Sequence, residues 1–529
     1  MSASNAGRKA TLVLLANLAG AALGYASLLL IGRYFAPAAY GAYLFALSIT
    51  GLVSVLSNLG LGIAHQRHVA QGVDPGRAFG VLARLRLAIA VPVLAAGAIA
   101  YAIWTAAKGQ AVTDATTPLV LGLALTVQLL AGARQSLFDT WQGQQRVNRI
   151  ELAKGLDTFL VVVLLANAAL LVAHLQGRWE IVPGVGAFWA GVLGLDAPLT
   201  VPQGAALLAT SYVLAKGVSF LLALGWWLTD GIRMGPWDRD LARAYLRFAM
   251  PLALVGGLTM VLQYTDTLLL GFLWTAREVG LYGAAQRLSS LCLLGALAVG
   301  TVLFPRFATL HAVGDRDGER ATFERSERYL LVLAAPLAAA MVALPRQGLH
   351  VAVGDAYLDA AVPLQLLALW ALVIAMEQPI SSRLMGTGSL SPVVRTVTIN
   401  AVGNVLLNLL LVPRFGPSGS GVATLVSTAV AYLYLRHKGR QAFAIPWIEG
   451  HQVRTLTSAL LAGAFWKAGA IWTGAAAFDR FWKLGAWGLS GLIVYAFVLA
   501  ALGGIRREDL AFLRRVGHPS ALLDELRGR

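Results

Sequence analysis

Long apolar segments recur along this sequence and constrain its fold more than any other feature. A helix rises about 1.5 Å per residue, so each segment is long enough to cross a hydrocarbon layer of about 30 Å. Backbone groups in that layer have no water to bond, and apolar runs of this length favour helices. The sequence therefore predicts an all-α integral membrane protein of about 14 transmembrane helices. We place them near 10–32, 41–64, 87–107, 118–138, 155–175, 204–228, 248–272, 281–304, 329–345, 361–380, 392–413, 417–436, 455–474 and 483–504.

The composition supports the same class. Of the 529 residues, 57% are hydrophobic and 13% are charged, whereas about 25% of the residues in a soluble domain are charged. The only cysteine, Cys292, excludes an internal disulfide and a Cys-rich metal site. The first apolar segment is too long for the core of a signal peptide, so we expect it to remain as the first span.

The connecting segments alternate in charge. A basic residue near a span's end, such as Arg134, is counted in the adjoining segment. The side that carries the N-terminus then holds 31 Lys and Arg residues, and the opposite side holds 8. The positive-inside rule then places both termini in the cytoplasm. This bias accounts for the net charge of +16 without a nucleic-acid partner, because anionic membrane lipids attract the basic segments.

The chain also contains an internal repeat. At a fixed offset of 239, residues 8–67 align with residues 247–306, and both segments start on the same side of the membrane. We therefore expect two parallel six-helix lobes, at 1–240 and 241–437, followed at 438–529 by two extra C-terminal helices and a basic tail. The matched pairs include Arg8 with Arg247, Gly32 with Gly271, Gly41 with Gly280 and Tyr43 with Tyr282, and Gly143 matches Gly386 at offset 243.

The most distinctive part of the repeat is a short link between two spans. Gly32 and Gly271 each end a span, and Gly41 and Gly280 begin the next one. Such a link is typical of a tight outer hairpin, and we expect the tyrosine that follows to sit at the headgroup boundary.

Four stretches carry a resemblance to a known family: GRYFAPAAYGAY (32–43), SNLGLGIAHQRHVA (57–70), VGDAYLDAAVPLQLLALW (353–370) and INAVGNVLLNLLLVPRFGPSGSGVATLVSTAVAYL (399–433). With six plus six spans and an extra pair, the chain resembles the O-antigen-type polysaccharide flippases of the MOP superfamily, relatives of multidrug MATE exporters and lipid II flippases. The resemblance implies a MATE-like fold in the plasma (inner) membrane of a prokaryote. It further implies that an undecaprenyl-pyrophosphate-linked oligosaccharide is moved to the outer leaflet, with H⁺ or Na⁺ as the expected coupling ion.

Charged residues inside spans are costly and therefore point to function or pairing. Asp266 and Arg287 lie at similar depth on two spans joined by a short link, so we expect them to meet. Either they form a structural ion pair, or Arg287 faces the cleft and binds an anionic cargo while Asp266 sets its exposure or takes a proton. Lys216 is at the midpoint of its span with no acidic residue one helical turn away. It either lines a cationic cavity or makes a polar contact within the bundle.

Amide and phenol groups are the remaining candidates for a polar cleft. Asn400, Asn404 and Asn408 form one stripe on a helix. Such a stripe either holds helices together or recognises sugar hydroxyl groups. The polar-cleft candidates are Asn17, Tyr25, Tyr264, Asn400 and Asn404.

Other function classes fit less well. The sequence has no P-loop and no HExxH motif, so we expect no nucleotide hydrolysis, no metal and no cofactor. A MATE-like exporter of cationic drugs would prefer an acidic cleft, whereas Lys216, Arg287 and Asp266 sum to a charge of +1. A membrane ligase or polymerase acting on polyprenyl-linked glycan is the second alternative. We therefore favour a transporter over an enzyme.

Overall fold

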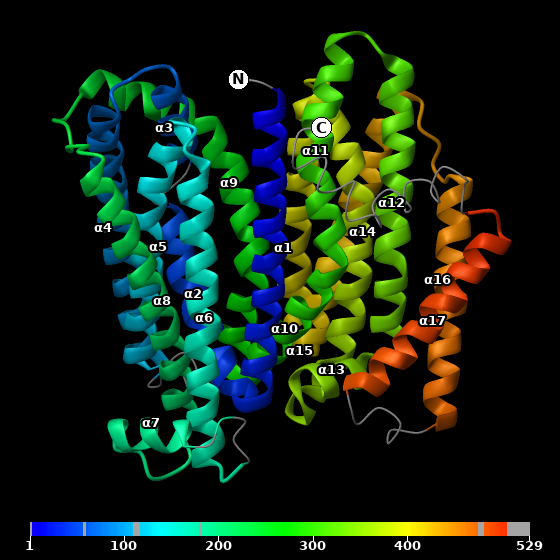
Figure 1. The fold of residues 1–529 in the computed structure, drawn as a ribbon, viewed down its shortest axis with the longest axis horizontal. Helices are drawn as coiled ribbons and strands as arrows, with labels where there is room; N and C mark the ends of the chain where they lie inside the picture. Colours follow the sequence, from blue (N-terminus) through cyan, green and yellow to red (C-terminus); the bar gives the residue numbers. More distant parts are fainter. Residues whose placement is uncertain are drawn as a thin grey trace. The chain divides into compact units, whose positions relative to one another are not determined.

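The computed structural model describes residues 3–56, 60–108, 117–178, 182, 184–473 and 481–504, and within these ranges it is helical (Figure 1). The chain divides into two compact units. We call residues 18–283 the N-unit, and residues 1–17 with 284–529 the C-unit.

The N-unit is built from the first ten helices. It consists mainly of long helices, with the short helix α3 between α2 and α4 and the short helix α7 between α6 and α8 in the chain. The helices are α1 (Ala3–Tyr34, of which the first part belongs to the C-unit), α2 (Pro37–Leu56), α3 (Leu61–Ala70), α4 (Pro75–Lys108), α5 (Pro118–Gly143), α6 (Val147–Leu175), α7 (Val185–Leu193), α8 (Val201–Thr229), α9 (Arg239–Leu273) and the first half of α10 (Ala276–Ser289).

The C-unit contains the rest of α10 and the helices that follow. Leu331, Ala335, Ala462, Trp466 and Tyr495 form a buried cluster that joins α12, α16 and α17. The elements are η1 (Ser290–Leu293), α11 (Leu294–Ala312), α12 (Arg316–Ala343), α13 (Pro345–Val353), η2 (Asp355–Ala360), α14 (Ala361–Gly386), α15 (Leu390–Phe443), α16 (Gly450–Thr473) and α17 (Phe481–Ala501).

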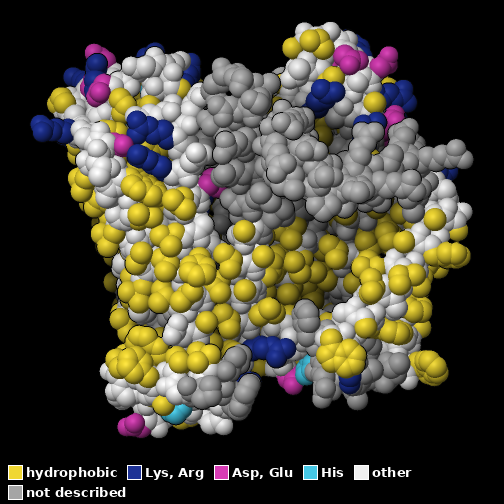
Figure 2. All heavy atoms as spheres, viewed as in Figure 1, with side chains coloured by type: hydrophobic (Ala, Val, Ile, Leu, Met, Phe, Trp, Pro, Cys, Tyr) yellow, Lys and Arg dark blue, Asp and Glu magenta, His cyan; other side chains and the backbone are white. Residues whose placement is uncertain are grey.

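The helices have the character of membrane spans. Eight helices of the described ranges are long and apolar enough to cross a membrane, and hydrophobic side chains cover the middle of the face in Figure 2. Within the described residues every predicted span overlaps a helix, and α15 holds two of them because its backbone leaves the helical conformation at Gly416 (φ 52°, ψ −132°). The all-α membrane fold is thus confirmed, and a count of fourteen is consistent with it. The predicted second span, 41–64, falls on α2 and the start of α3, and its residues 57–59 lie outside the described residues.

The predicted repeat reappears in the helix boundaries. The ends of α1 and α9, Tyr34 and Leu273, differ by 239 residues, as do the first residues of α2 and α10. The whole of α5 corresponds to the whole of α14 at an offset of 243. The compact units do not divide where the sequence repeat does, because α9 packs on α2, α3 and α4. The lobe boundary near residue 240 therefore stays a prediction.

The packing around two matched glycines repeats as well. A Cβ atom at Gly143 would lie 2.8 Å from Cβ of Val69, and one at Gly386 would lie 3.0 Å from the backbone nitrogen of Ala308. Val69 and Ala308 are themselves 239 residues apart. In each unit a glycine at the end of a long helix thus allows close approach of a neighbouring helix, α3 at Gly143 and α11 at Gly386, and the two contacts lie at matched positions of the repeat.

The repeated link brings its own two glycines together inside the N-unit. A Cβ atom at Gly41 would lie 1.7 Å from the carbonyl oxygen of Ala276, and one at Gly280 would lie 1.9 Å from that of Pro37. Pro37 and Ala276 are again matched positions, so the contact is reciprocal, as across a twofold axis. The role of the glycines is therefore close backbone packing between α2 and α10.

The tyrosines of this link are buried against neighbouring helices, and their position at the headgroup boundary stays a prediction. Tyr43 is 2% exposed and stacks on Tyr212, with ring centroids 5.1 Å apart. Tyr282 is 1% exposed and its hydroxyl donates a hydrogen bond to Asp266. Close packing at the two glycines encloses the neighbouring side chains.

Candidate functional site

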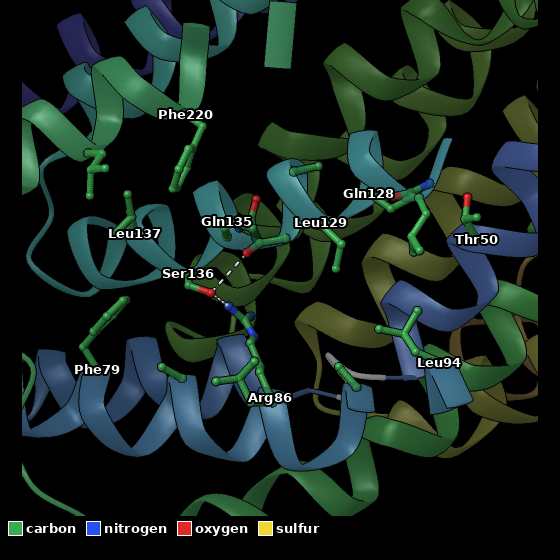
Figure 3. Close-up of a pocket in the computed structure, with 18 of the residues that line it drawn as sticks. Thr50, Phe79, Arg86, Leu94, Gln128, Leu129, Gln135, Ser136, Leu137 and Phe220 are labelled. Atoms are coloured by element: carbon green, nitrogen blue, oxygen red, sulfur yellow. Dashed lines mark hydrogen bonds between the residues drawn. The ribbon is translucent and has the colours of Figure 1, made fainter. Parts of the chain in front are cut away.

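The N-unit contains a cavity of about 690 Å³ that is bounded mainly by α4, α5 and α8. In Figure 3, Phe79 and Leu137 lie at one end, and Leu94 of α4 and Thr50 of α2 lie at the other. Five of the 19 lining residues are polar: Thr50, Arg86, Gln128, Gln135 and Ser136. The cavity is therefore a mostly apolar space with one polar wall.

The polar wall is organised around the carboxylate of Asp139, which is 2% exposed. Arg86 donates to Oγ of Ser136 and to Oδ2 of Asp139, the latter over 2.8 Å. Gln66 and Gln135 each donate to Oδ1 of Asp139 over 2.9 Å. The carboxylate thus balances the guanidinium charge, and the wall is polar but close to neutral.

A buried histidine lies next to this wall. His65 belongs to α3 and is 0% exposed, although the sequence places it in a connecting segment. Its Nε2 is 2.8 Å from Oγ1 of Thr140 on α5, and its Nδ1 is 3.0 Å from the hydroxyl of Tyr245 on α9. Both ring nitrogens have partners, so His65 ties three helices together.

Lys216 lies midway along α8 and is not alone. Its ammonium group contacts Oδ2 of Asp157 on α6, which is also 3.0 Å from Nη1 of Arg134 on α5. Arg134 further donates to Oγ of Ser219 over 2.7 Å. Of the two alternatives for Lys216, these contacts are those of a polar contact within the bundle, and the acidic partner lies on a neighbouring helix and not one turn away on α8.

This ion cluster of Lys216, Asp157 and Arg134 carries a net charge of +1 inside three spans. Asp157 and Arg134 are nearly buried, and the Lys216 side chain is 21% exposed. Within the described residues, Oδ1 of Asp157 has no hydrogen-bond partner. Arg134 was expected near the end of its span, but α5 continues to Gly143, which places Arg134 in the interior.

The other predicted charges lie in different units. Asp266, which is 3% exposed, belongs to the N-unit, and Arg287 is an exposed residue of α10 in the C-unit. Their contact stays a prediction. Tyr264 packs against Gly51, where a Cβ atom would lie 2.5 Å from its hydroxyl oxygen. Tyr25 is half-buried on α1, and the side chain of Asn17 lies outside the described residues.

The asparagine stripe holds the two halves of α15 against each other. These halves, on either side of Gly416, are joined by three hydrogen bonds whose partners step by four residues in opposite directions, as in an antiparallel helical hairpin. These bonds match the first alternative for the stripe, in which the amides hold helices together. Sugar recognition by Asn400 and Asn404 stays a prediction. The bonds are Thr428 Oγ1 to Asn400 Oδ1 (3.3 Å), Asn404 Nδ2 to Thr424 Oγ1 (3.2 Å) and Ser420 Oγ to Asn408 Oδ1 (2.9 Å).

The C-unit contains a second charged cluster that sequence reasoning missed. Glu327 is 1% exposed and contacts Arg436, which is equally buried. Glu449 and His451 lie beside Glu327. One nitrogen or oxygen atom from each of these three side chains lies within 4.8 Å of the other two, a spacing that could hold a metal ion. The Arg436 guanidinium already supplies a positive charge there, so we assign the cluster to ion pairing. A hydrogen bond from His451 holds the pKa of Glu449 below its ordinary value.

The chain is similar in sequence to proteins described as belonging to polysaccharide biosynthesis and glycan flipping. Residues 187–362 match the family described as polysaccharide biosynthesis protein. The chain is 20% identical over 432 residues, 80% of its length, to the probable low-salt glycan biosynthesis flippase Agl15 of Haloferax volcanii, and covers 81% of that protein. It is 25% identical over 198 residues, 37% of its length, to an uncharacterized membrane protein of Methanocaldococcus jannaschii, and spans only 39% of that relative.

Solved structures show the same fold. The lipid II flippase MurJ in an inward closed conformation matches with a TM-score of 0.67 at 13% identity, covering 95% of this chain and 99% of MurJ. An inward-facing MATE-family multidrug transporter of the MOP superfamily matches with a TM-score of 0.61 at 14% identity, covering 80% of this chain and 94% of the transporter. The predicted resemblance and the MATE-like fold are thus confirmed.

Proposed function

We propose that this protein is a flippase that moves a polyprenyl-pyrophosphate-linked oligosaccharide from the cytoplasmic to the outer leaflet of a prokaryotic plasma membrane. The observation that carries the proposal is the similarity to a lipid II flippase over 95% of the chain, joined by similarity to a probable glycan flippase over 80%. Two parallel six-helix lobes suit alternating access, in which the headgroup crosses between the lobes and both termini stay in the cytoplasm.

The charges inside the membrane fit this cargo. A pyrophosphate needs cationic groups at depth, because an ammonium or guanidinium interacts strongly with phosphate where the dielectric constant is low. In this proposal Lys216, part of a cluster of net charge +1, and the exposed Arg287 attract the pyrophosphate. Asp266 tunes Arg287 or takes a coupling proton, and Asn17, Tyr25, Tyr264 and Asn400 contact the glycan, whereas Asn404 is 1% exposed and holds the α15 hairpin.

A leaflet-resolved assay tests the proposal. Protein reconstituted in vesicles with a labelled polyprenyl-pyrophosphate oligosaccharide should speed the appearance of glycan to an impermeant reagent on the opposite leaflet. Imposing a H⁺ or Na⁺ gradient should change that rate. Transport of hydrophobic cations without glycan movement would favour a MATE-like exporter. Transfer of the glycan to an acceptor would favour a ligase or polymerase.

Variants test the site within the same assay. We expect Lys216→Ala and Arg287→Ala to lower the flipping rate while the amount of inserted protein stays nearly unchanged. Lys467→Ala is the matched control, because Lys467 is an exposed cation on α16. If the double variant Asp266→Ser with Arg287→Ser regains the folding and transport that the single changes lose, the pair is structural and has no role in binding.

A further inference from the structure

The cavity in the N-unit is kept open by small residues. Of its 19 lining residues, five are alanine or glycine. Gly132 lies on α5, and a Cβ atom added there would meet no atom within 4 Å. Because protein interiors are normally close-packed, an apolar space of this size calls for an occupant. The small residues are Ala83, Ala90, Ala131, Gly132 and Ala133.

The cavity is long and lies within membrane spans. Its α4 wall runs from Phe79 to Leu94, fifteen residues apart, or about 22 Å at the rise of a helix. The α4, α5 and α8 segments that line it belong to helices apolar enough to cross a membrane. Leu87 and Leu129 line it and are 61% and 52% exposed. The space is thus open along one edge, so a chain could enter sideways.

The electrostatics favour a hydrocarbon chain over a headgroup. Arg86 is the charged residue in the lining, and Asp139 neutralises it at 2.8 Å. A pyrophosphate would have to compete with that carboxylate, and a glycan would place its hydroxyl groups against leucine and phenylalanine side chains without partners. A hydrocarbon chain has no such cost and gains by burial.

We propose that this cavity binds the isoprenoid chain of the polyprenyl carrier, which deepens the proposed function and rests on it. The chain lies between α4 and the pair α5 and α8, with its methyl branches in the spaces left by Ala90 and Gly132. The pyrophosphate lies outside the cavity.

Photo-crosslinking tests this assignment on the full-length protein in lipid nanodiscs. The probe is a polyprenyl pyrophosphate with a diazirine at the far end of its isoprenoid chain. Peptide mass spectrometry should place the label on the segments 79–94, 125–137 and 220–227. Unlabelled polyprenyl alcohol, which has no phosphate, should compete, and inorganic pyrophosphate should not.

A filled cavity supplies the decisive variant. Gly132→Phe should lower labelling of these segments at least about fivefold, since overpacking costs on the order of 1 kcal/mol or more. Gly122→Phe is the matched control, because Gly122 lies on the same helix, does not line the cavity and also has no atom within 4 Å of an added Cβ. Ala90→Leu is a smaller filling change that should act in the same direction if Gly132→Phe does not fold.

Several outcomes would overturn the assignment. Labelling elsewhere in a protein that does flip glycan would refute the cavity while leaving the proposed function intact. Equal labelling of the cavity by a phospholipid with a diazirine in its acyl chain would assign the space to ordinary lipid. Labelling of the cavity in a protein that moves no glycan would refute the proposed function instead.

Discussion

The reciprocal contact between Gly41 and Gly280 gives the sharpest prediction for stability. In Gly41→Ala, the new methyl group would lie 1.7 Å from the carbonyl oxygen of Ala276 and 2.5 Å from the backbone nitrogen of Gly280. Both are backbone atoms, so no side chain can rotate away and the two helices must separate. Overpacking of this kind costs about 1–3 kcal/mol, and occasionally more.

Helix propensity acts in the opposite direction and provides the control. Replacing a glycine inside a helix with alanine favours the helix by roughly 0.5–1 kcal/mol where nothing obstructs the methyl group. Gly24 in α1 is such a position, because no atom lies within 4 Å of an added Cβ. We therefore expect Gly24→Ala to be neutral or stabilising and Gly41→Ala to be destabilising.

The symmetry of the contact adds a second expectation. Gly280→Ala should destabilise about as much as Gly41→Ala, since its methyl group would lie 1.9 Å from the carbonyl oxygen of Pro37. The double variant should cost less than the two single changes together, because one separation of the helices accommodates both methyl groups. Thermal unfolding of detergent-purified protein, followed by loss of the monodisperse species, measures all four variants. A Gly41→Ala protein as stable as Gly24→Ala would refute the packing argument.

Three further outcomes follow from the polar contacts. Asp157→Asn should lower the free energy of unfolding by about 3–5 kcal/mol, because it leaves two cations buried without their carboxylate. Lys216→Met should lower it clearly less. Equal losses for the two variants in unfolding assays would contradict the shared ion cluster. Asn408→Ala should cost roughly 0.5–1.5 kcal/mol by removing a buried hydrogen bond within α15, measurable by the same thermal assay. Burial raises the pKa of Asp230, but the hydrogen bond from Arg149 and neighbouring arginine charges outweigh it and lower that pKa. The stability lost in Asp230→Asn at neutral pH should therefore shrink as the pH falls through the folded-state pKa, below about 3.9, and a constant difference would refute the linkage.

The candidate site shows where reasoning from the sequence stopped. Lys216 was recognisable as a costly charge at the middle of a span, but its partner Asp157 lies 59 residues earlier on another helix. Arg86 and Asp139 gave no signal, because each sits near a predicted span boundary where charges are common. Which charges meet depends on how each helix is rotated and which helices are neighbours, and no short stretch of sequence encodes either.

The sequence by itself determined that the chain is a helical membrane protein with a repeated half. Span length is a local property measured against a fixed hydrocarbon thickness, and the offset of 239 is visible in the glycines themselves. The tertiary structure alone decided that those glycines face each other, that the link tyrosines are buried, and that small residues of α4 and α5 enclose an apolar cavity. These features arise from contacts between helices far apart in the chain, where a difference of one methyl group decides whether two backbones can touch.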